Sequence, residues 1–141
     1  MSSNIKILCL CLVLGSCSFI NFDAPRNMDN ACSILQQRPS FDRAFQKTKR
    51  KWGAPVHVQM AILHQESKFI PNAKTPRKYF LGIVPWGRQS SAYGYAQALD
   101  GTWSDYKKSS GRRFASRSNI HDATDFMGWY MQESRRRLGI K

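Results

Sequence analysis

Beyond residue 28, apolar residues recur every three or four positions, the spacing that places side chains on one face of a helix. A short helix is predicted up to Gln37, with Asp29 or Asn30 as its N-cap. A second helix is predicted from Pro39 to about Trp52. Its core-facing side is expected to consist of Phe41, Ala44, Phe45 and Thr48.

A third helix is predicted between Pro55, which suits a helix start, and Pro71, which ends the pattern. One face of this helix is expected to carry Val58, Ile62, Glu66 and either Phe69 or Ile70. Glu66 would then lie at the foot of an apolar stripe, where removal from water would raise its pKa and suit it to proton donation. A solvated glutamate at a helix end, or one bound to an arginine, is the alternative interpretation.

Residues 71–92 combine prolines and glycines with the aromatic residues Tyr79, Phe80 and Trp86, and no convincing pair of strands is evident there. A loop of this length in a small domain usually has a function. Its aromatic side chains would form either a small core of their own or a wall that binds sugar, and the sequence does not choose between the two.

The remaining chain predicts a turn and two more helices, so the expected fold class is mainly α. Within the segment 93–97, Gly94 suits a close backbone approach or an unusual backbone angle, and Gln97 offers a hydrogen-bond donor and an acceptor. A fourth helix is predicted to begin at Thr102 with Asp105 in a capping arrangement. A fifth is predicted to begin at Asn119 and to pack through Ile120, Ala123, Met127, Tyr130 and Met131.

Composition restricts the kind of partner. The 141 residues fit one small domain, and their formal charge of +13 favours a polyanionic partner. Nucleic acid, an anionic membrane and an anionic wall polymer all meet that description. Charge alone does not distinguish among them.

The N-terminus indicates export. Residues 5–14 form an apolar run too short to span a bilayer, and residues 1–16 are interpreted as a signal peptide. The sequence Leu14-Gly15-Ser16-Cys17 resembles a bacterial lipobox, which implies acylation of Cys17 and a lipid anchor. Ser18 resembles the signal for the periplasmic face of the outer membrane; a plain signal peptide and a periplasmic protein are the alternative. Residues 17–28 then serve as a tether and residues 29–141 as the domain, and a nucleic-acid partner is not expected.

The cysteines and histidines predict no metal site. Cys9 and Cys11 would leave with the signal peptide and Cys17 would take lipid, so Cys32 is the remaining free thiol, expected to be a small buried side chain. His57 and His64 are too far apart in sequence to suggest a metal site.

Three blocks in order resemble the soluble-type lytic transglycosylases, a family with the goose-lysozyme-like fold, over about residues 50–138. The first is Glu66-Ser67-x-Phe69, and the second is Tyr93-Gly94-Tyr95-Ala96-Gln97 followed by Thr102-Trp103. The third is Asn119-Ile120 followed by Gly128-x-Tyr130-Met131. The resemblance extends to a small lipoprotein branch of the family.

This resemblance implies cleavage of the MurNAc–GlcNAc bond of peptidoglycan to 1,6-anhydro products, without a cofactor. Glu66 would be the catalytic acid and then the base, and Ser67 would orient it. Gln97 and the backbone of residues 94–96 would hold the glycan. Tyr93, Tyr95 and Tyr130 are the tyrosines that could lie near the acid.

One departure from the family pattern bears on activity. Members normally continue into a helix with an Ala-Tyr-x-x-Gly-type block, which does not occur before Lys141. The expected fold is therefore a C-terminally truncated domain with a more open groove. A non-catalytic peptidoglycan-binding lipoprotein and a lysozyme-type hydrolase are the alternative functions.

Overall fold

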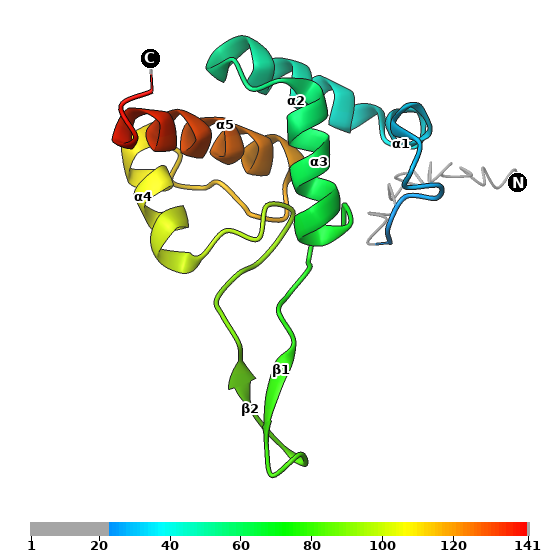
Figure 1. Ribbon diagram of the computed structural model, residues 1–141, viewed down its shortest axis with the longest axis vertical. Helices are drawn as coiled ribbons and strands as arrows, with labels where there is room; N and C mark the ends of the chain where they lie inside the picture. The colour runs from blue at the N-terminus through cyan, green and yellow to red at the C-terminus, as the bar shows by residue number, and fades with distance from the viewer. Residues whose placement is uncertain (1–22, 141) are drawn as a thin grey trace, which may run out of the picture.

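Five helices and one β-hairpin make up the computed structural model, which describes residues 23–140 (Figure 1). In chain order they are α1 (Ala31–Gln37), α2 (Pro39–Trp52), α3 (Val56–Ser67), β1 (Arg77–Phe80), β2 (Val84–Arg88), α4 (Asp100–Ser110) and α5 (Ile120–Arg137). The predicted mainly α fold class is confirmed. None of the helices in residues 23–140 combines the length and apolarity needed to cross a bilayer. The predicted signal peptide and the lipidation site Cys17 lie outside the described residues.

Local signals in the sequence explain most helix boundaries. The side chain of Asn30 accepts a hydrogen bond from the Ser33 amide at the start of α1, as its prediction as an N-cap requires. Asn119 caps α5 in the same way, through the His121 and Asp122 amides. The helix α4 begins at Asp100, and no side chain caps it. The predicted capping arrangement of Thr102 was therefore wrong.

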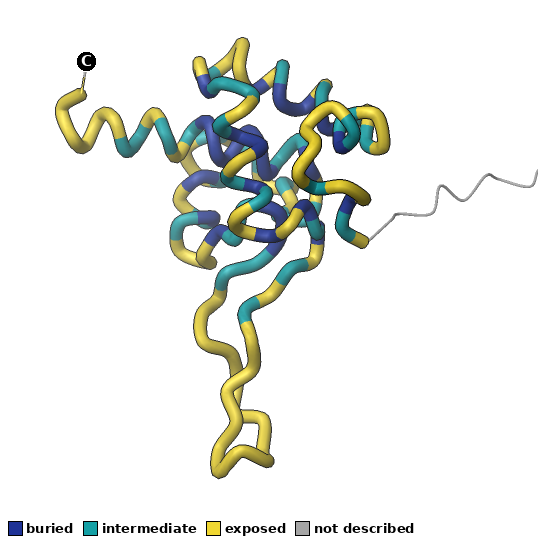
Figure 2. The backbone as a smooth tube through the Cα atoms, turned by 45° about the vertical axis from the view of Figure 1, so that its right-hand side comes forward, coloured by how far each residue is buried: buried dark blue, intermediate teal, exposed yellow. Residues whose placement is uncertain are grey.

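The core lies between α2 and α5, which pack against each other, with α3 and α4 closing its sides (Figures 1 and 2). The predicted inner face of α2 is buried as expected. Aromatic rings fill much of the space because they bury large areas and pack edge to face. The largest fully buried side chains of the core are Tyr106, Phe45, Phe69, Ile34 and Leu63.

The predicted inner face of α3 was wrong. Its buried side chains are Gln59, Met60, Leu63 and Ser67, whereas Glu66 is exposed. The error arises at the end of the helix, where Lys68 and Phe69 both take positive φ angles of 52° and 62°. These angles turn the chain so that Phe69 enters the core from outside the helix, and helical spacing cannot be extended through it.

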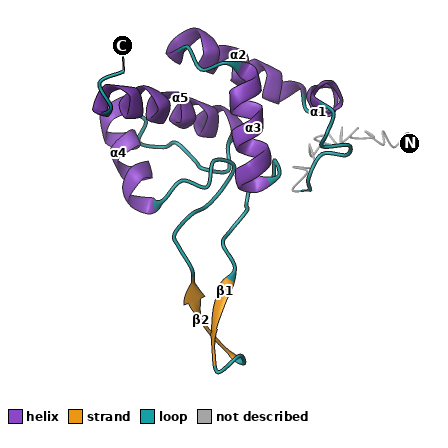
Figure 3. Cartoon of the chain, in the orientation of Figure 1, coloured by secondary structure: helices purple, strands orange, loops and turns teal. Residues whose placement is uncertain are grey.

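Strands β1 and β2 form an antiparallel hairpin where no strand pair was predicted (Figure 3). The Ile83 amide donates to the Phe80 carbonyl at 3.2 Å, and positive φ angles at Leu81 and Gly82 give the pattern of a type I′ turn. Every residue from 76 to 91 is exposed. The interpretation of these aromatics as a small core was therefore wrong.

Cys32 is also exposed rather than buried. It occupies the second position of the short helix α1, whose buried side chain is that of Ile34. The apolar character of the thiol is not enough to bury it, because a helix of seven residues buries only a small part of its surface.

Candidate functional site

A cavity of about 350 Å³ lies where α3, α4, α5 and the turn before α4 meet. Its volume is at the lower end of the range for small-molecule sites. Its walls are mainly apolar, with a few polar groups among them. The lining residues are Ile62, Glu66, Ala96, Gln97, Ala98, Leu99, Thr102, Phe126, Met127, Tyr130 and Met131.

Glu66 reaches this cavity from the last turn of α3. It is the only residue with a carboxyl group among the described residues that line it. Its side chain is exposed, so the prediction of a carboxyl removed from water was wrong for the protein without a ligand. Removal of the Glu66 carboxyl from water would therefore require a bound ligand to cover it.

The turn before α4 is held by its backbone. Gly94 has a φ of 80°, and a Cβ at this position would lie 2.2 Å from the backbone oxygen of Arg117. The Tyr95 amide donates to the same oxygen at 3.1 Å. Both predicted reasons for a glycine, an unusual angle and a close backbone approach, are therefore met.

Gln97 completes this turn and also lines the cavity. Its Nε2 donates to the Ala73 and Gly94 carbonyls, each at 2.9 Å. Since the amide nitrogen holds the turn, the side-chain oxygen is the atom that can accept a hydrogen bond from a ligand.

Four of the predicted site residues do not line the cavity: Gly94, whose place in the turn is given above, and Ser67, Tyr95 and Tyr93. Ser67 is buried and donates to the Leu63 carbonyl at 3.2 Å, so its hydroxyl does not orient Glu66. Tyr95 is buried in the core, which raises the pKa of its hydroxyl. The ring of Tyr93 contacts two cations, with Lys74 Nζ 5.4 Å and Arg117 Cζ 5.3 Å from its centre.

Tyr130 does line the cavity, together with Ala96 and Gln97. It is 51% exposed, and its ring stacks on that of Phe126 with centroids 5.9 Å apart. The sequence did not assign the apolar floor of the cavity, which Leu99, Phe126 and Met127 help to form. Their closeness in sequence to the family-like blocks is the signal that could have indicated them.

A buried carboxylate links α5 to neighbouring parts of the chain. Asp125 lies in the second turn of that helix and is 3% exposed. It accepts hydrogen bonds from Lys51 Nζ, Trp52 Nε1, Tyr106 OH and Arg112 NH1 at 2.8, 2.8, 2.8 and 3.1 Å. Burial acts to raise the pKa of Asp125, but the hydrogen bonds it accepts, first from Lys51 and then from Trp52, outweigh burial and hold that pKa below the ordinary value.

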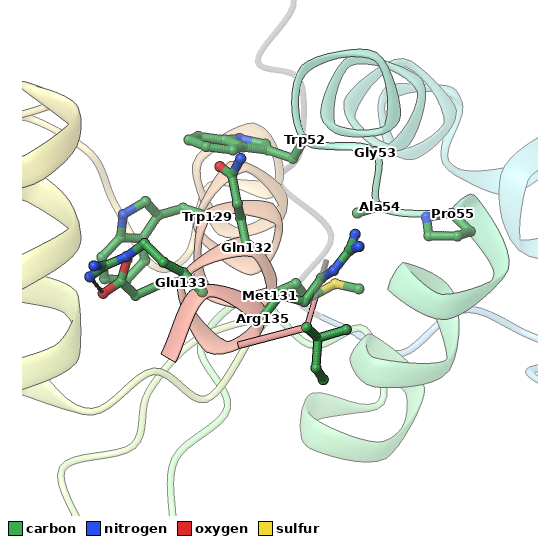
Figure 4. A pocket seen from close by; sticks show the side chains of 11 residues that line it. Trp52, Gly53, Ala54, Pro55, Trp129, Met131, Gln132, Glu133 and Arg135 are labelled. Carbon is green, nitrogen blue, oxygen red and sulfur yellow. Dashed lines mark hydrogen bonds and ion pairs between the residues drawn. The ribbon is translucent and has the colours of Figure 1, made fainter. Parts of the chain in front are cut away.

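A larger cavity of about 670 Å³ lies elsewhere, between the α2–α3 junction and the end of α5 (Figure 4). Trp52 and Trp129 line it, and so does Glu133. Hydrogen bonds from Arg136 and then Arg137 lower the pKa of Glu133, and both arginines form ion pairs with it. Because its carboxylate is already paired, we take the smaller cavity at Glu66 as the site.

No group of three His, Cys, Asp or Glu side chains within residues 23–140 could hold a metal ion.

The sequence model of the family described as Transglycosylase SLT domain matches residues 5–141. No curated protein and no solved structure matches the chain.

Proposed function

This chain belongs to the transglycosylase SLT domain family, and we propose that it is a peptidoglycan lytic transglycosylase. Its mainly helical, lysozyme-like fold and the cavity at Glu66 support this function. The formal charge of +13 favours association with an anionic wall polymer.

The proposed reaction uses one carboxyl group twice. As an acid, Glu66 protonates the glycosidic oxygen that leaves C1 of N-acetylmuramic acid, and the substrate's own N-acetyl group assists. The carboxylate then removes the proton of the 6-hydroxyl of the same sugar, whose oxygen bonds to C1. The glycan is thus cut without water and ends in a 1,6-anhydro ring.

A single carboxyl group at the cavity carries this proposal. Most glycosidases use two carboxyl groups, one as acid and one as base or nucleophile. Glu66 has no second acid beside it among the described lining residues. Asp100, the next acid along the chain, is ion-paired with Arg117. An internal hydroxyl nucleophile removes the need for a second carboxylate.

The walls of the cavity suit a sugar chain. The ring of Tyr130 and the methyl group of Ala96 provide apolar contacts, and the side-chain oxygen of Gln97 can accept a hydrogen bond from a sugar hydroxyl or amide. The bound glycan would itself displace water from the exposed Glu66 and so favour the internal hydroxyl over water.

The test is the Glu66→Gln variant incubated with purified peptidoglycan, with products identified by mass spectrometry. We expect 1,6-anhydro muropeptides from the wild type and a loss of about 10²–10⁴ in rate in the variant, the typical contribution of proton transfer by a positioned side chain. Glu133→Gln is the matched control, because Glu66 and Glu133 are the only glutamates of the chain. It should leave the products unchanged.

Other products would assign another function. Reducing ends in place of anhydro ends would identify a hydrolase of the lysozyme type. Sedimentation with peptidoglycan by both proteins, without soluble products, would identify a non-catalytic binding protein. The exposure of Glu66 favours the non-catalytic candidate, since within residues 23–140 no other residue shields the carboxyl from water.

We also propose that Cys17 is acylated and anchors the protein at the periplasmic face of the outer membrane. The lipobox-like sequence that ends at Cys17 supports this. Labelled fatty acid fed to expressing bacteria should enter the wild type and the Cys32→Ser variant, but not Cys17→Ser. Equal labelling of Cys17→Ser would rule out the anchor, and fractionation would then separate a periplasmic protein from a membrane-bound one.

A further inference from the structure

The β1–β2 hairpin has no role in the proposed chemistry. None of its residues lines the cavity at Glu66. It extends away from the helices, and its whole length is exposed (Figures 1 and 2). A small domain gains little by exposing so many large apolar side chains, which usually mark an interaction site.

The end of the hairpin is apolar and its stem is basic. Residues 79–87 contain no charged side chain, and Leu81, Ile83 and Trp86 are 81%, 82% and 75% exposed. The stem carries Arg77, Lys78 and Arg88, and no acidic residue occurs between residues 67 and 99. Apolar and aromatic groups with adjacent cations are what an anionic membrane surface binds.

The apex supports the same conclusion. Leu81 has a φ of 52° at a turn position where asparagine, aspartate or glycine is preferred. A leucine there carries a backbone cost without any packing within the protein, since its side chain is exposed. An apolar side chain at this point is explained if it packs against something outside the chain.

The dimensions fit shallow insertion. From Tyr79 to the turn, the hairpin advances by about 10 Å at the usual rise per strand residue. This matches the depth of about 5–10 Å to which apolar groups enter the interfacial region of a bilayer. Deeper insertion would bury the unpaired edges of two short strands, so the interface is the favourable depth.

We propose that residues 79–87 insert into the interfacial region of an anionic lipid bilayer, with Arg77, Lys78 and Arg88 contacting its headgroups. This would hold the domain on the membrane at a point distinct from Cys17. The inference does not depend on catalysis at Glu66.

The test follows Trp86 in the full chain mixed with lipid vesicles. Residues 5–14 are also apolar and could bind vesicles by themselves, so the bound fraction is not the readout. The fluorescence of Trp86 is obtained as the difference between the wild type and Trp86→Phe. With vesicles containing phosphatidylglycerol, we expect a blue shift of this signal and its quenching by brominated acyl chains.

Variants distinguish the contribution of residues 79–87, the tip of the hairpin, from that of other exposed apolar residues. The double variant Leu81→Asp/Ile83→Asp should abolish the shift and the quenching. Each of Arg77→Gln and Lys78→Gln should raise about fivefold the lipid concentration that gives half of the Trp86 shift. Phe114→Asp is the matched control, because Phe114 is 99% exposed outside the hairpin. It should respond as the wild type does. All these positions are exposed, so circular dichroism should show unchanged helices.

Several results would overturn the proposal. These are an unchanged Trp86 signal on anionic vesicles, an equal response on phosphatidylcholine alone, and a response that survives the double variant. Self-association of the wild type that the double variant abolishes, without a lipid response, would assign the tip to a second copy of the chain. Loss of sedimentation with peptidoglycan in that variant, again without a lipid response, would assign it to the glycan.

Discussion

Gly128 has no side chain because the indole of Trp52 occupies the space where a Cβ would lie. That Cβ would be 2.4 Å from Trp52 Cδ1. The indole is not free to withdraw, since its Nε1 donates to Asp125 at 2.8 Å. The glycine of the Gly-x-Tyr block thus serves the packing of α5 on α2, and this packing positions Tyr130 two residues later.

We predict that Gly128→Ala destabilises the protein by about 1–3 kcal/mol, the usual cost of overpacking. The sign is informative, because alanine in a helix interior normally stabilises by about 1 kcal/mol relative to glycine. Urea unfolding should show a lower midpoint for Gly128→Ala. Gly101→Ala in α4 is the control, since nothing lies within 4 Å of its added Cβ. A Gly128→Ala variant more stable than the wild type would contradict the role assigned to Trp52.

The sequence motifs converge on one candidate cavity, but they did not predict the direction of each side chain. Glu66, Ala96, Gln97 and Tyr130 line one cavity, as a site built from the three sequence blocks requires. Ser67 and Tyr95 belong to the same blocks and point into the protein instead. A sequence block indicates which segment of the chain lies at the cavity. The φ angles at a helix end or a turn determine which of two adjacent side chains faces outward.

At the scale of elements, the sequence predicted those segments that have one buried face. The helix α2 agreed with its prediction because one of its faces is in the core and the other in water, which produces a clear period. The hairpin has no buried face, so its strands lack the alternation that identifies a half-buried strand. Its turn also has leucine where asparagine or aspartate would have signalled a hairpin. The sequence could therefore mark residues 71–92 as an unusually long connection, but not predict the strands within it.

At the scale of the whole molecule, Asp125 joins parts of the chain that are far apart in sequence. Its carboxylate connects α2, through Lys51 and Trp52, with Tyr106 of α4 and with Arg112. No local pattern predicts such a group, since an aspartate near a helix start has an ordinary explanation in the helix dipole. The tertiary structure alone brings these donors together.

We predict that Asp125→Asn destabilises the protein by about 3 kcal/mol at neutral pH, because buried donors lose their charged acceptor. Asp105→Asn, an exposed position on α4, should have little effect. Unfolding by urea at several pH values measures both the size of this loss and its dependence on protonation.

The pH dependence has two parts, each with a defined sign. The pKa of Asp125 is lowered in the folded protein, so its contribution is present above the ordinary aspartate pKa of about 3.9 and is lost as the pH falls through the folded value. Burial, and then Lys47 and Arg43, lower the pKa of His121 as well. Protonation of His121 therefore favours the unfolded chain, and stability should decrease as the pH falls through about 6.5.

Asp125→Asn should remove the loss of stability in the lower range and keep the one near neutrality, and His121→Gln should do the reverse. A wild-type stability that stays constant from neutral pH down to about 4 would exclude the His121 contribution. If Asp125→Asn kept the full acid dependence below that pH, the carboxylate would not be the group that holds α2, α4 and α5 together. The result therefore tests whether one buried charge holds α2 and α4 against α5, the helix that carries Tyr130.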